Sequence, residues 1–305
     1  MTRKKTIVFI CNNKGGIGKS TSAAFIGNAL EVLGYTVLYI SGDRHTNQVL
    51  KTLQPSTLHF DIKDPITMDE AMQTAIEAKE DIVFFDLAGN SSEDAVAYFS
   101  EQDYEIFREA GLRFVVAIVA NQHNDAIVGG IEWVETFAGN AEPIIFANGN
   151  KTPEGEPIDL TKIASGDDLI EVAENRIVEV PRFSPRMLKL YTEHPAVPSS
   201  YFPNGVMGKK LGHNAFSASP WNRLQTEIAR SLAKHAEWLV GKPIPKPLDL
   251  GDQGTKDAVP NAALERLKAY KDTVINNMAN PGAVTATAPA DVAAAGVGAK
   301  KPKTD

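Results

Sequence analysis

The sequence predicts an α/β protein with a doubly wound, mostly parallel sheet, and three observations predict it. Short apolar runs recur between stretches of helical periodicity, these runs are nearly continuous, and a glycine-rich segment joins the first run to the first helical stretch. Strands that helices cover on both faces have this apolar character. We therefore expect parallel strands, helical crossovers and a ligand site at the carboxyl ends of the strands.

The expected elements follow the chain in order. Apolar runs rich in β-branched and aromatic residues predict strands over 7–11, 36–40, 81–85, 114–120, 143–147 and 177–180. Helical periodicity predicts helices over 19–33, 68–79, 92–110, 126–137, 167–175, 185–192 and 221–240. With 305 residues, 43% of them hydrophobic, the chain can bury a large core, and we expect one domain over residues 1–240.

The composition changes after residue 240. The proline-rich stretch from Lys242 to Pro247, with proline at every second position, predicts an extended linker over 241–260. Apolar residues at near-helical spacing predict a helix over 261–278 that docks on the core, on a partner or weakly on a membrane surface. Residues 279–305 are rich in Ala, Pro, Gly and Thr and lack large apolar side chains, so we expect disorder there.

The bulk composition excludes several classes. Cys11 is the single cysteine, which excludes a disulfide framework and a cysteine-rich metal or cluster site, and a buried thiol is expected. No apolar run is long enough to span a bilayer and no signal-peptide core is present, so a cytoplasmic protein is expected. The net charge of −7 argues against a polyanion-binding surface over the whole protein, although a local basic patch can contact DNA.

The segment from Asn13 to Thr21 is a predicted phosphate-binding loop, or P-loop, because it lies between a predicted strand and a predicted helix. Small residues let backbone N–H groups approach a polyphosphate, and the helix N-terminus adds its dipole. Lys19 is expected at the β- and γ-phosphates, and Ser20 is expected to offer its hydroxyl to Mg²⁺. The expected nucleotide-binding residues of the loop are Gly15, Gly16, Ile17, Gly18, Lys19, Ser20 and Thr21.

An extra lysine distinguishes this loop from a plain P-loop. Lys14 precedes the glycines, and Asn13 stands where a plain loop has its first glycine. The pattern K-G-G-x-G-K-[ST] resembles the deviant Walker A loop of the ParA/MinD family of ATPases, strongly at the loop and weakly over the rest of residues 1–240. The resemblance implies ATP and Mg²⁺ as ligands and a homodimer in the ATP state. It also implies that Lys14 reaches across the dimer to the phosphates of the other subunit.

The resemblance and the strand pattern together suggest the metal site and the switch loops. Asp86 closes a predicted strand and is the candidate metal-organising carboxylate, with a turn-capping role as the alternative. The loop 87–90 would sense the γ-phosphate through the backbone of Gly89. Asp43 matches the second aspartate of the family's D-x-D switch and would orient the attacking water. The expected metal-site residues are Ser20, Asp43 and Asp86, and the expected catalytic residues are Lys14, Lys19 and Asp43.

The switch departs from the family pattern. Ser41 replaces the first aspartate, and Arg44 and His45 replace the usual Pro-Gln, so unusual hydrolysis is expected. A solvated turn is the alternative for Asp43. Base contacts in the family come from an asparagine at the end of a late strand and from a loop after a Pro-Arg pair. The corresponding residues here are Asn148, Pro181 and Arg182, with Asn150 or a simple turn role as alternatives.

The resemblance implies a slow, partner-stimulated ATPase that acts in plasmid or DNA partitioning, plasmid stability or conjugation. A membrane partner is not expected, because the tail is not a clear basic amphipathic helix. The segment 201–221 has no match in the family pattern and is a candidate docking site for a specific partner. Candidate contacts to nonspecific DNA are Arg182, Arg186, Lys189, Lys209, Lys210, Arg223, Arg230 and Lys234.

Three alternatives remain open at this point. A metabolic ligase of the dethiobiotin or cobyrinate type uses the same fold and would activate a substrate carboxylate. A nucleotide-gated ATPase that positions complexes on a membrane is the second. The third is a non-catalytic nucleotide-gated scaffold, which the altered residues Ser41, Arg44 and His45 motivate.

Overall fold

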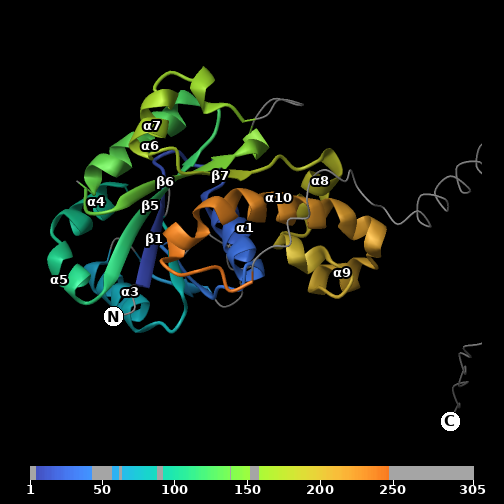
Figure 1. The fold of residues 1–305 in the computed structure, drawn as a ribbon, viewed down its shortest axis with the longest axis horizontal. Helices are drawn as coiled ribbons and strands as arrows, with labels where there is room; N and C mark the ends of the chain where they lie inside the picture. The colour runs from blue at the N-terminus through green and yellow to red at the C-terminus, as the bar shows by residue number, and fades with distance from the viewer. Residues whose placement is uncertain are drawn as a thin grey trace, which may run out of the picture. The chain divides into compact units, whose positions relative to one another are not determined.

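A parallel sheet of seven strands forms the centre of the fold (Figure 1). The computed structural model describes residues 5–42, 57–61, 64–87, 92–137, 139–151 and 158–246. The strands are β1 Lys5–Cys11, β2 Val37–Ser41, β3 Leu58–His59, β4 Ile82–Asp86, β5 Leu112–Ala120, β6 Glu142–Asn148 and β7 Ile177–Val180. Their order is β3-β2-β4-β1-β5-β6-β7, so the chain proceeds in opposite directions from the central β1. In sheets of this kind the point of reversal, here the carboxyl end of β1, is where ligands bind.

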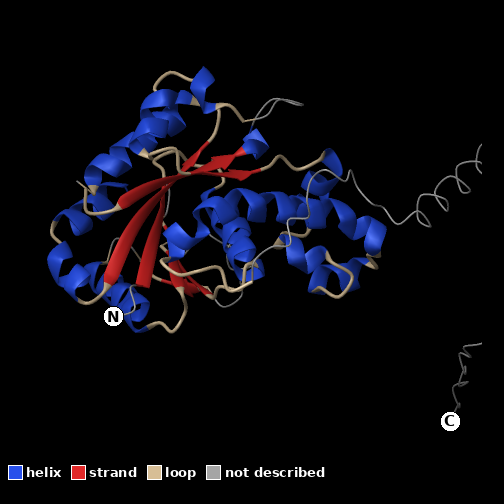
Figure 2. Cartoon of the chain, viewed as in Figure 1, coloured by secondary structure: helices blue, strands red, loops and turns tan. Residues whose placement is uncertain are grey.

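Helices cover both faces of the sheet (Figure 2). They are α1 Lys19–Val32, α3 Pro65–Glu77, α4 Ser92–Ser100, α5 Tyr104–Glu109, α6 Asn124–Thr136, α7 Gly166–Val172, α8 Pro185–Glu193, α9 Val206–Leu211 and α10 Ala215–Val240. Short 3₁₀ turns lie at Gly149–Lys151, Leu160–Lys162 and Pro198–Tyr201. The predicted doubly wound α/β fold is therefore confirmed.

The core has two halves because alternate side chains of each strand point to opposite faces. In β1, Val8 and Ile10 join the half that is covered by α1, α8 and α10. Ile7, Phe9 and Cys11 join the half that is covered by α3 to α7. Cys11 is fully buried, as predicted, and burial raises the pKa of its thiol well above the usual range.

Several element boundaries differ from the sequence predictions. The continuous helix predicted over 92–110 is wrong: α4 ends at Ser100, and Asp103 caps α5 by accepting a hydrogen bond from the Glu105 N–H. The last helix begins before Pro220, not after it, because Asn214 caps it by accepting from the Phe216 N–H; Pro220 lies inside the helix, where it leaves one backbone hydrogen bond unmade. Strand β3 and helix α9 were not predicted, since both are short and carry weak periodicity.

The chain stays on the domain for a few residues after α10. The Tyr35 hydroxyl donates to the Lys242 carbonyl at 2.8 Å, and the Lys246 N–H donates to the Leu33 carbonyl at 2.9 Å. Most of the predicted linker, the predicted helix 261–278 and the tail 279–305 lie outside the described residues. Among the helices that are described, none has the length and apolar character to cross a bilayer.

Candidate nucleotide site

The predicted P-loop connects β1 to α1 at the carboxyl end of the central strand. Gly16 and Gly18 have φ values of +71° and +92°, a left-handed conformation that glycine adopts without strain. Gly18 is the N-cap of α1, and the first turn of this helix has no acidic side chain. The positive end of the helix is therefore not neutralised locally, which suits an anionic ligand.

Lys19 closes the loop from within. Its side chain folds back so that Nζ donates to the carbonyls of Asn12 and Lys14, each at 3.2 Å. The residue is 8% exposed, so its charge lies over the loop and not in bulk water. A partly desolvated ammonium at this position is suited to a phosphate oxygen, which is a strong charged acceptor.

Ser20 and Asp86 meet at the carboxyl edge of the sheet. Asp86 ends β4, which pairs directly with β1, and it is 2% exposed. The Ser20 hydroxyl donates to Asp86 Oδ2 at 2.6 Å. The structure therefore brings together Ser20 and Asp86, two of the three predicted metal-site residues. The third, Asp43, lies outside the described residues, as does Gly89 of the sensing loop.

The donor set of Ser20 and Asp86 fits Mg²⁺. This ion prefers oxygen ligands, usually takes one or two from protein side chains, and completes its shell with water and phosphate oxygens. Within the part of the chain that the structure describes, no group of three or more His, Cys, Asp or Glu side chains is arranged to hold a metal. A magnesium ion here would take the Ser20 hydroxyl and the Asp86 carboxylate as ligands, and water and phosphate oxygens would add to its shell.

The first half of the P-loop is attached to α6. Lys14 Nζ pairs with Asp125 Oδ2 at 3.0 Å, and the two side chains are 34% and 79% exposed. The hydrogen bond from Lys14 and its charge hold the pKa of the Asp125 carboxyl below its usual value. Asn13 adds a hydrogen bond to Glu132 Oε2 at 2.6 Å. In this structure Lys14 is therefore engaged within its own chain, and its role across a dimer stays a prediction.

Asn12 anchors the loop and was not predicted from the sequence. Its buried side-chain amide donates to the carbonyls of Val119 and Ala126, at 3.0 and 2.7 Å, and its oxygen accepts from the Lys14 N–H at 2.8 Å. It thus links the loop to β5 and α6. The only sequence signal was a polar residue directly after an apolar strand, which is also common at ordinary turns.

The second half of the loop is attached to β6. Asn148 is 2% exposed, and its Nδ2 donates to the Ile17 carbonyl at 2.6 Å. Its Oδ1 accepts from both the N–H and the Nδ2 of Asn150, each at 3.1 Å. Asn150 Oδ1 in turn accepts from the Phe183 N–H at 2.8 Å. The structure thus connects the predicted base-contacting asparagine to the P-loop and to the segment that contains Pro181 and Arg182.

The remaining predicted residues have separate environments. The Thr21 hydroxyl shares a hydrogen bond of 3.0 Å with the Tyr191 hydroxyl of α8, so this side chain holds α1 to α8. Pro181 is half-buried and Arg182 is exposed. Gly15 is exposed, and an added Cβ there would meet no atom within 4 Å, so the loop is open at this point.

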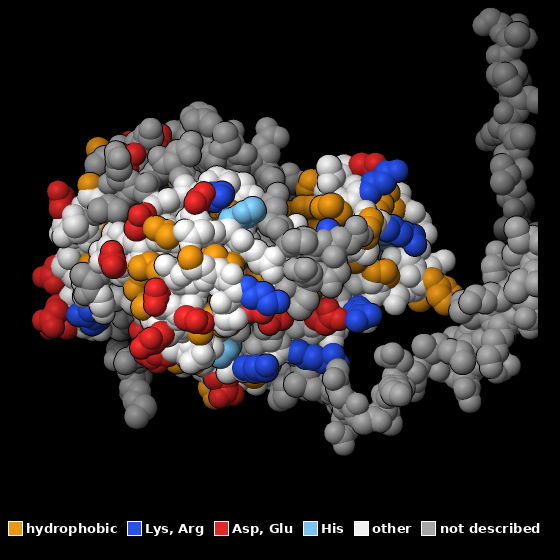
Figure 3. Space-filling model, turned by 90° about the horizontal axis from the view of Figure 1, so that it is seen from above, with side chains coloured by type: hydrophobic (Ala, Val, Ile, Leu, Met, Phe, Trp, Pro, Cys, Tyr) orange, Lys and Arg blue, Asp and Glu red, His pale blue; other side chains and the backbone are white. Residues whose placement is uncertain are grey.

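The candidate DNA contacts differ in exposure. Arg182, Arg186, Lys189, Lys209, Lys210, Arg223 and Lys234 are exposed, whereas Arg230 is half-buried. Arg223 pairs with Glu227 one turn further along α10 at 2.8 Å. Figure 3 keeps the left-to-right placement of Figure 1, and its lysine and arginine side chains lie mostly toward the side of α8 to α10.

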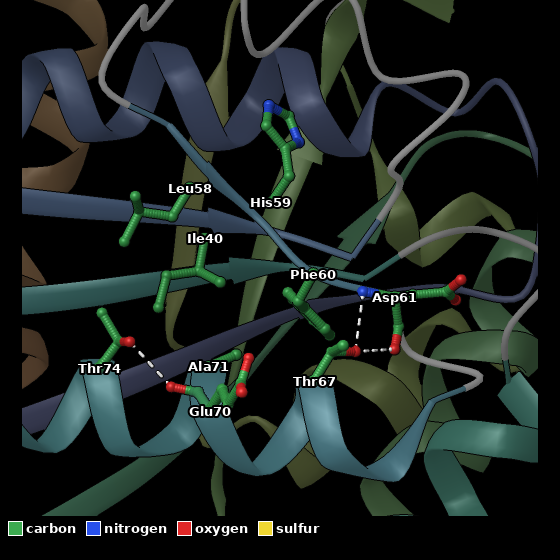
Figure 4. A pocket seen from close by; sticks show the side chains of 9 residues that line it. All are labelled: Ile40, Leu58, His59, Phe60, Asp61, Thr67, Glu70, Ala71 and Thr74. Atoms are coloured by element: carbon green, nitrogen blue, oxygen red, sulfur yellow. Dashed lines mark hydrogen bonds between the residues drawn. The ribbon is translucent and has the colours of Figure 1, made fainter.

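A separate cavity of about 480 Å³ lies at the sheet edge, between β3 and α3 (Figure 4). Ile40, Phe60 and Ala71 form apolar parts of its lining, and the Thr67 hydroxyl donates to the Asp61 carbonyl at 2.6 Å. None of the P-loop residues lines this cavity. It is therefore distinct from the site around Lys19, Ser20 and Asp86.

No family model and no curated protein matches this chain. Similar solved structures include the MinD cell division protein of Aquifex aeolicus, with 18% identity, a TM-score of 0.44, and 80% of this chain and 99% of that chain covered. The septum site-determining protein MinD of Pyrococcus horikoshii OT3, complexed with Mg-ADP, has 17% identity and a TM-score of 0.42 over 73% and 96% of the two chains. The ParA family ATPase of Chlorobium tepidum TLS has 15% identity and a TM-score of 0.40 over 62% and 89%.

These names agree with the family that the loop sequence resembles. The identities are below 20% and the TM-scores are below 0.5. A likeness of this degree carries no argument about activity.

Proposed function

We propose that this chain is an ATPase switch that binds ATP with Mg²⁺, associates into a homodimer in that state, and resets by hydrolysis. One observation carries the proposal: the Ser20 hydroxyl and the Asp86 carboxylate meet at 2.6 Å beside a glycine loop that Lys19 closes. A phosphate cradle, a cation and an oxygen pair for a metal are the parts that phosphoryl transfer from a nucleoside triphosphate requires.

The chemistry follows from these parts. In hydrolysis a water oxygen bonds to the γ-phosphorus while the bond to the bridging oxygen breaks, which gives ADP and phosphate. Lys19 would balance the charge on the phosphates, and Ser20 and Asp86 would hold Mg²⁺, which would supply further positive charge to the reacting phosphates. Asp43 is our candidate for orienting the water, on the sequence argument alone. Positioning and electrostatic stabilisation of this kind dominate phosphoryl transfer.

The proposed dimer depends on Lys14. Its partner Asp125 is 79% exposed, so water screens the ion pair and the lysine can leave it at little cost. A triphosphate in a second copy offers more negative charge than one carboxylate. Binding of the γ-phosphate and dimer formation would then stabilise each other by linkage, and ADP would favour separate chains.

DNA partitioning is the proposed cellular use, and the charge distribution supports it. The chain carries a net charge of −7, yet residues 181–223 contain six basic residues and one acidic residue, Glu193. The basic residues are Arg182, Arg186, Lys189, Lys209, Lys210 and Arg223. A dimer doubles this surface, and paired basic patches bind a phosphate backbone with strong salt dependence. A partner protein that stimulates hydrolysis completes the proposed cycle.

ATP turnover with and without Mg²⁺ tests the proposal. We expect slow, Mg²⁺-dependent release of phosphate, and we expect DNA to bind only the ATP state and to dissociate as salt rises. Asp86→Asn keeps an oxygen near Ser20 but removes the charge, so the Mg²⁺-dependent rate should fall about tenfold or more. No ATP binding, or turnover that rises with small carboxylates and ignores DNA, would contradict the proposal and favour a ligase.

A further inference from the structure

The side-chain amide of Asn148 is buried against the phosphate loop. Its contacts to Ile17 and Asn150 use at least three of the four hydrogen bonds that an asparagine amide can make. At 2% exposure, it would have to give up some of these bonds to pair with both polar groups on the edge of a base. Its geometry therefore favours a task at the loop.

That task follows from the planarity of the peptide bond. In a trans peptide the C=O and the following N–H point in opposite directions. The Ile17 carbonyl is held toward Asn148 at 2.6 Å, and no cis peptide is present among the described residues. The N–H of Gly18 must therefore point to the opposite side of this peptide. Backbone N–H groups in such loops are the donors that hold phosphate oxygens.

Close packing enforces the same orientation. A Cβ added at Gly18 would lie 2.3 Å from Asn148 Nδ2, so the amide sits directly against this backbone. Asn150 fixes the amide from the other side through two hydrogen bonds, and the Phe183 N–H fixes Asn150. The chain of contacts thus runs from the segment after β7 to the peptide that joins Ile17 and Gly18.

We propose that Asn148 is a positioning residue that orients the Ile17–Gly18 peptide and so acts on the phosphate end of the nucleotide, not on its base. The inference rests on the nucleotide binding proposed above, and it differs from the base contact that the sequence suggested for Asn148. Asn150 then holds Asn148 in place. Loss of either amide weakens the binding of any polyphosphate, whatever base it carries.

The test compares two ligands on the full chain by calorimetry: ATP with Mg²⁺, and tripolyphosphate with Mg²⁺, which has no base. Asn148→Leu is neutral and similar in shape, so it removes the hydrogen bonds without adding charge near the phosphates. We expect it to weaken both ligands by the same factor, about tenfold or more. The ratio of ATP to GTP affinity should stay unchanged.

Asn28→Leu is the matched control for a merely structural role. Asn28 is a buried amide of α1 at 4% exposure, where it donates to Ser199 Oγ at 3.0 Å and accepts from Gln225 Nε2 at 2.9 Å. Its loss should lower the thermal midpoint yet leave both affinities of the folded protein unchanged. Asn150→Ser is a milder second variant that removes one support of Asn148, and it should weaken both ligands equally by about twofold to fivefold.

Three outcomes would overturn the inference. Asn148→Leu that loses ATP but keeps tripolyphosphate would make Asn148 a base-reading residue. Unchanged affinity for both ligands in Asn148→Leu and Asn150→Ser would mean that Asn148 is a simple turn residue. Losses in Asn28→Leu equal to those in Asn148→Leu would show that general destabilisation weakens binding. Wild-type protein that binds neither ligand would instead refute the proposed function, so the two failures are distinguishable.

Discussion

The two halves of the phosphate loop are held in different ways. In the first half, the buried Asn12 holds the backbone N–H of Lys14, but the Lys14 side chain pairs with Asp125 of α6, whose side chain is 79% exposed. The second half, around Ile17 and Gly18, is attached to β6 through the buried amide of Asn148. Exposed ion pairs are screened and contribute little, whereas buried hydrogen bonds are costly to break. The loop therefore combines a firmly held backbone around Ile17 and Gly18 with a Lys14 side chain that is easily released.

The difference separates two tasks. A rigid second half suits the binding of phosphates by backbone N–H groups, because donors that are already oriented need no reorganisation. A weakly held Lys14 side chain can leave Asp125 and change partner when a second chain arrives. We expect changes around Ile17 and Gly18 to weaken nucleotide binding and changes at the Lys14–Asp125 pair to alter assembly.

The largest effect is expected for the buried lysine. Lys19→Ala removes a cation that is 8% exposed, and the affinity for ATP with Mg²⁺ should fall about 100-fold or more. Lys14→Ala, in the same loop but with its side chain 34% exposed, is the control and should retain most of the binding. Titration calorimetry measures both. Equal losses in the two variants would erase the distinction between the halves.

Gly18→Ala tests the rigid half through packing. The alanine would adopt φ +92° with its Cβ 2.3 Å from Asn148 Nδ2, and unfolding should become easier by about 2 kcal/mol or more. Gly139 has φ +79° with no atom within 4 Å of an added Cβ, so Gly139→Ala measures the backbone strain alone. Denaturant unfolding of both variants gives the difference. An equal cost at the two glycines would show that Asn148 does not constrain the loop.

Much of this site could be predicted from the sequence, and the reason is local. A strand, a glycine turn and a helix are adjacent in the chain, so the loop with Lys19 and Ser20 could be placed without knowing the fold. Asp86 could be placed because parallel strands bring their carboxyl ends to one edge. Asn148 was found as a residue, but its contact with Ile17 joins positions 131 residues apart. No local pattern encodes such a pairing.

The same reason explains what was missed. Asn12 contacts Val119 and Ala126 over separations of 107 and 114 residues, and Lys14 meets Asp125 over 111 residues. The break in the helix predicted over 92–110 depends on a cap at Asp103 within a sequence of good helical periodicity. The short helix α9 lies in the segment 201–221, which matched no family pattern.

A smaller effect is expected in the exposed half. Asp125→Asn removes the charge that holds Lys14, so ATP-dependent dimerisation should strengthen by about threefold, with little change in stability. Glu132→Gln is the control, because a glutamine oxygen still accepts the hydrogen bond from Asn13. Sedimentation with a non-hydrolysable ATP analogue measures the dimer constant. A weaker dimer in Asp125→Asn would mean that Asp125 assists assembly.

The smallest effect is expected for pH. The hydrogen bond and the charge of Lys14 lower the pKa of Asp125. The stabilisation that this ion pair adds is therefore complete above the unfolded pKa of about 3.9, and it is lost only as pH falls through the lower folded pKa. From about pH 6 to about pH 8 the wild-type and Asp125→Asn dimer constants should therefore keep a fixed ratio. A ratio that changes severalfold over this range would contradict a pair whose charges stay fixed.

Sedimentation velocity of the wild-type chain and Lys14→Ala tests the central claim most directly. Each protein is measured with Mg²⁺ and either ADP or a non-hydrolysable ATP analogue. We predict that the wild type is a monomer with ADP and a dimer with the analogue, while Lys14→Ala binds the analogue yet stays a monomer. A wild-type chain that stays monomeric with the analogue bound, or a Lys14→Ala variant that dimerises as wild type does, would contradict the account.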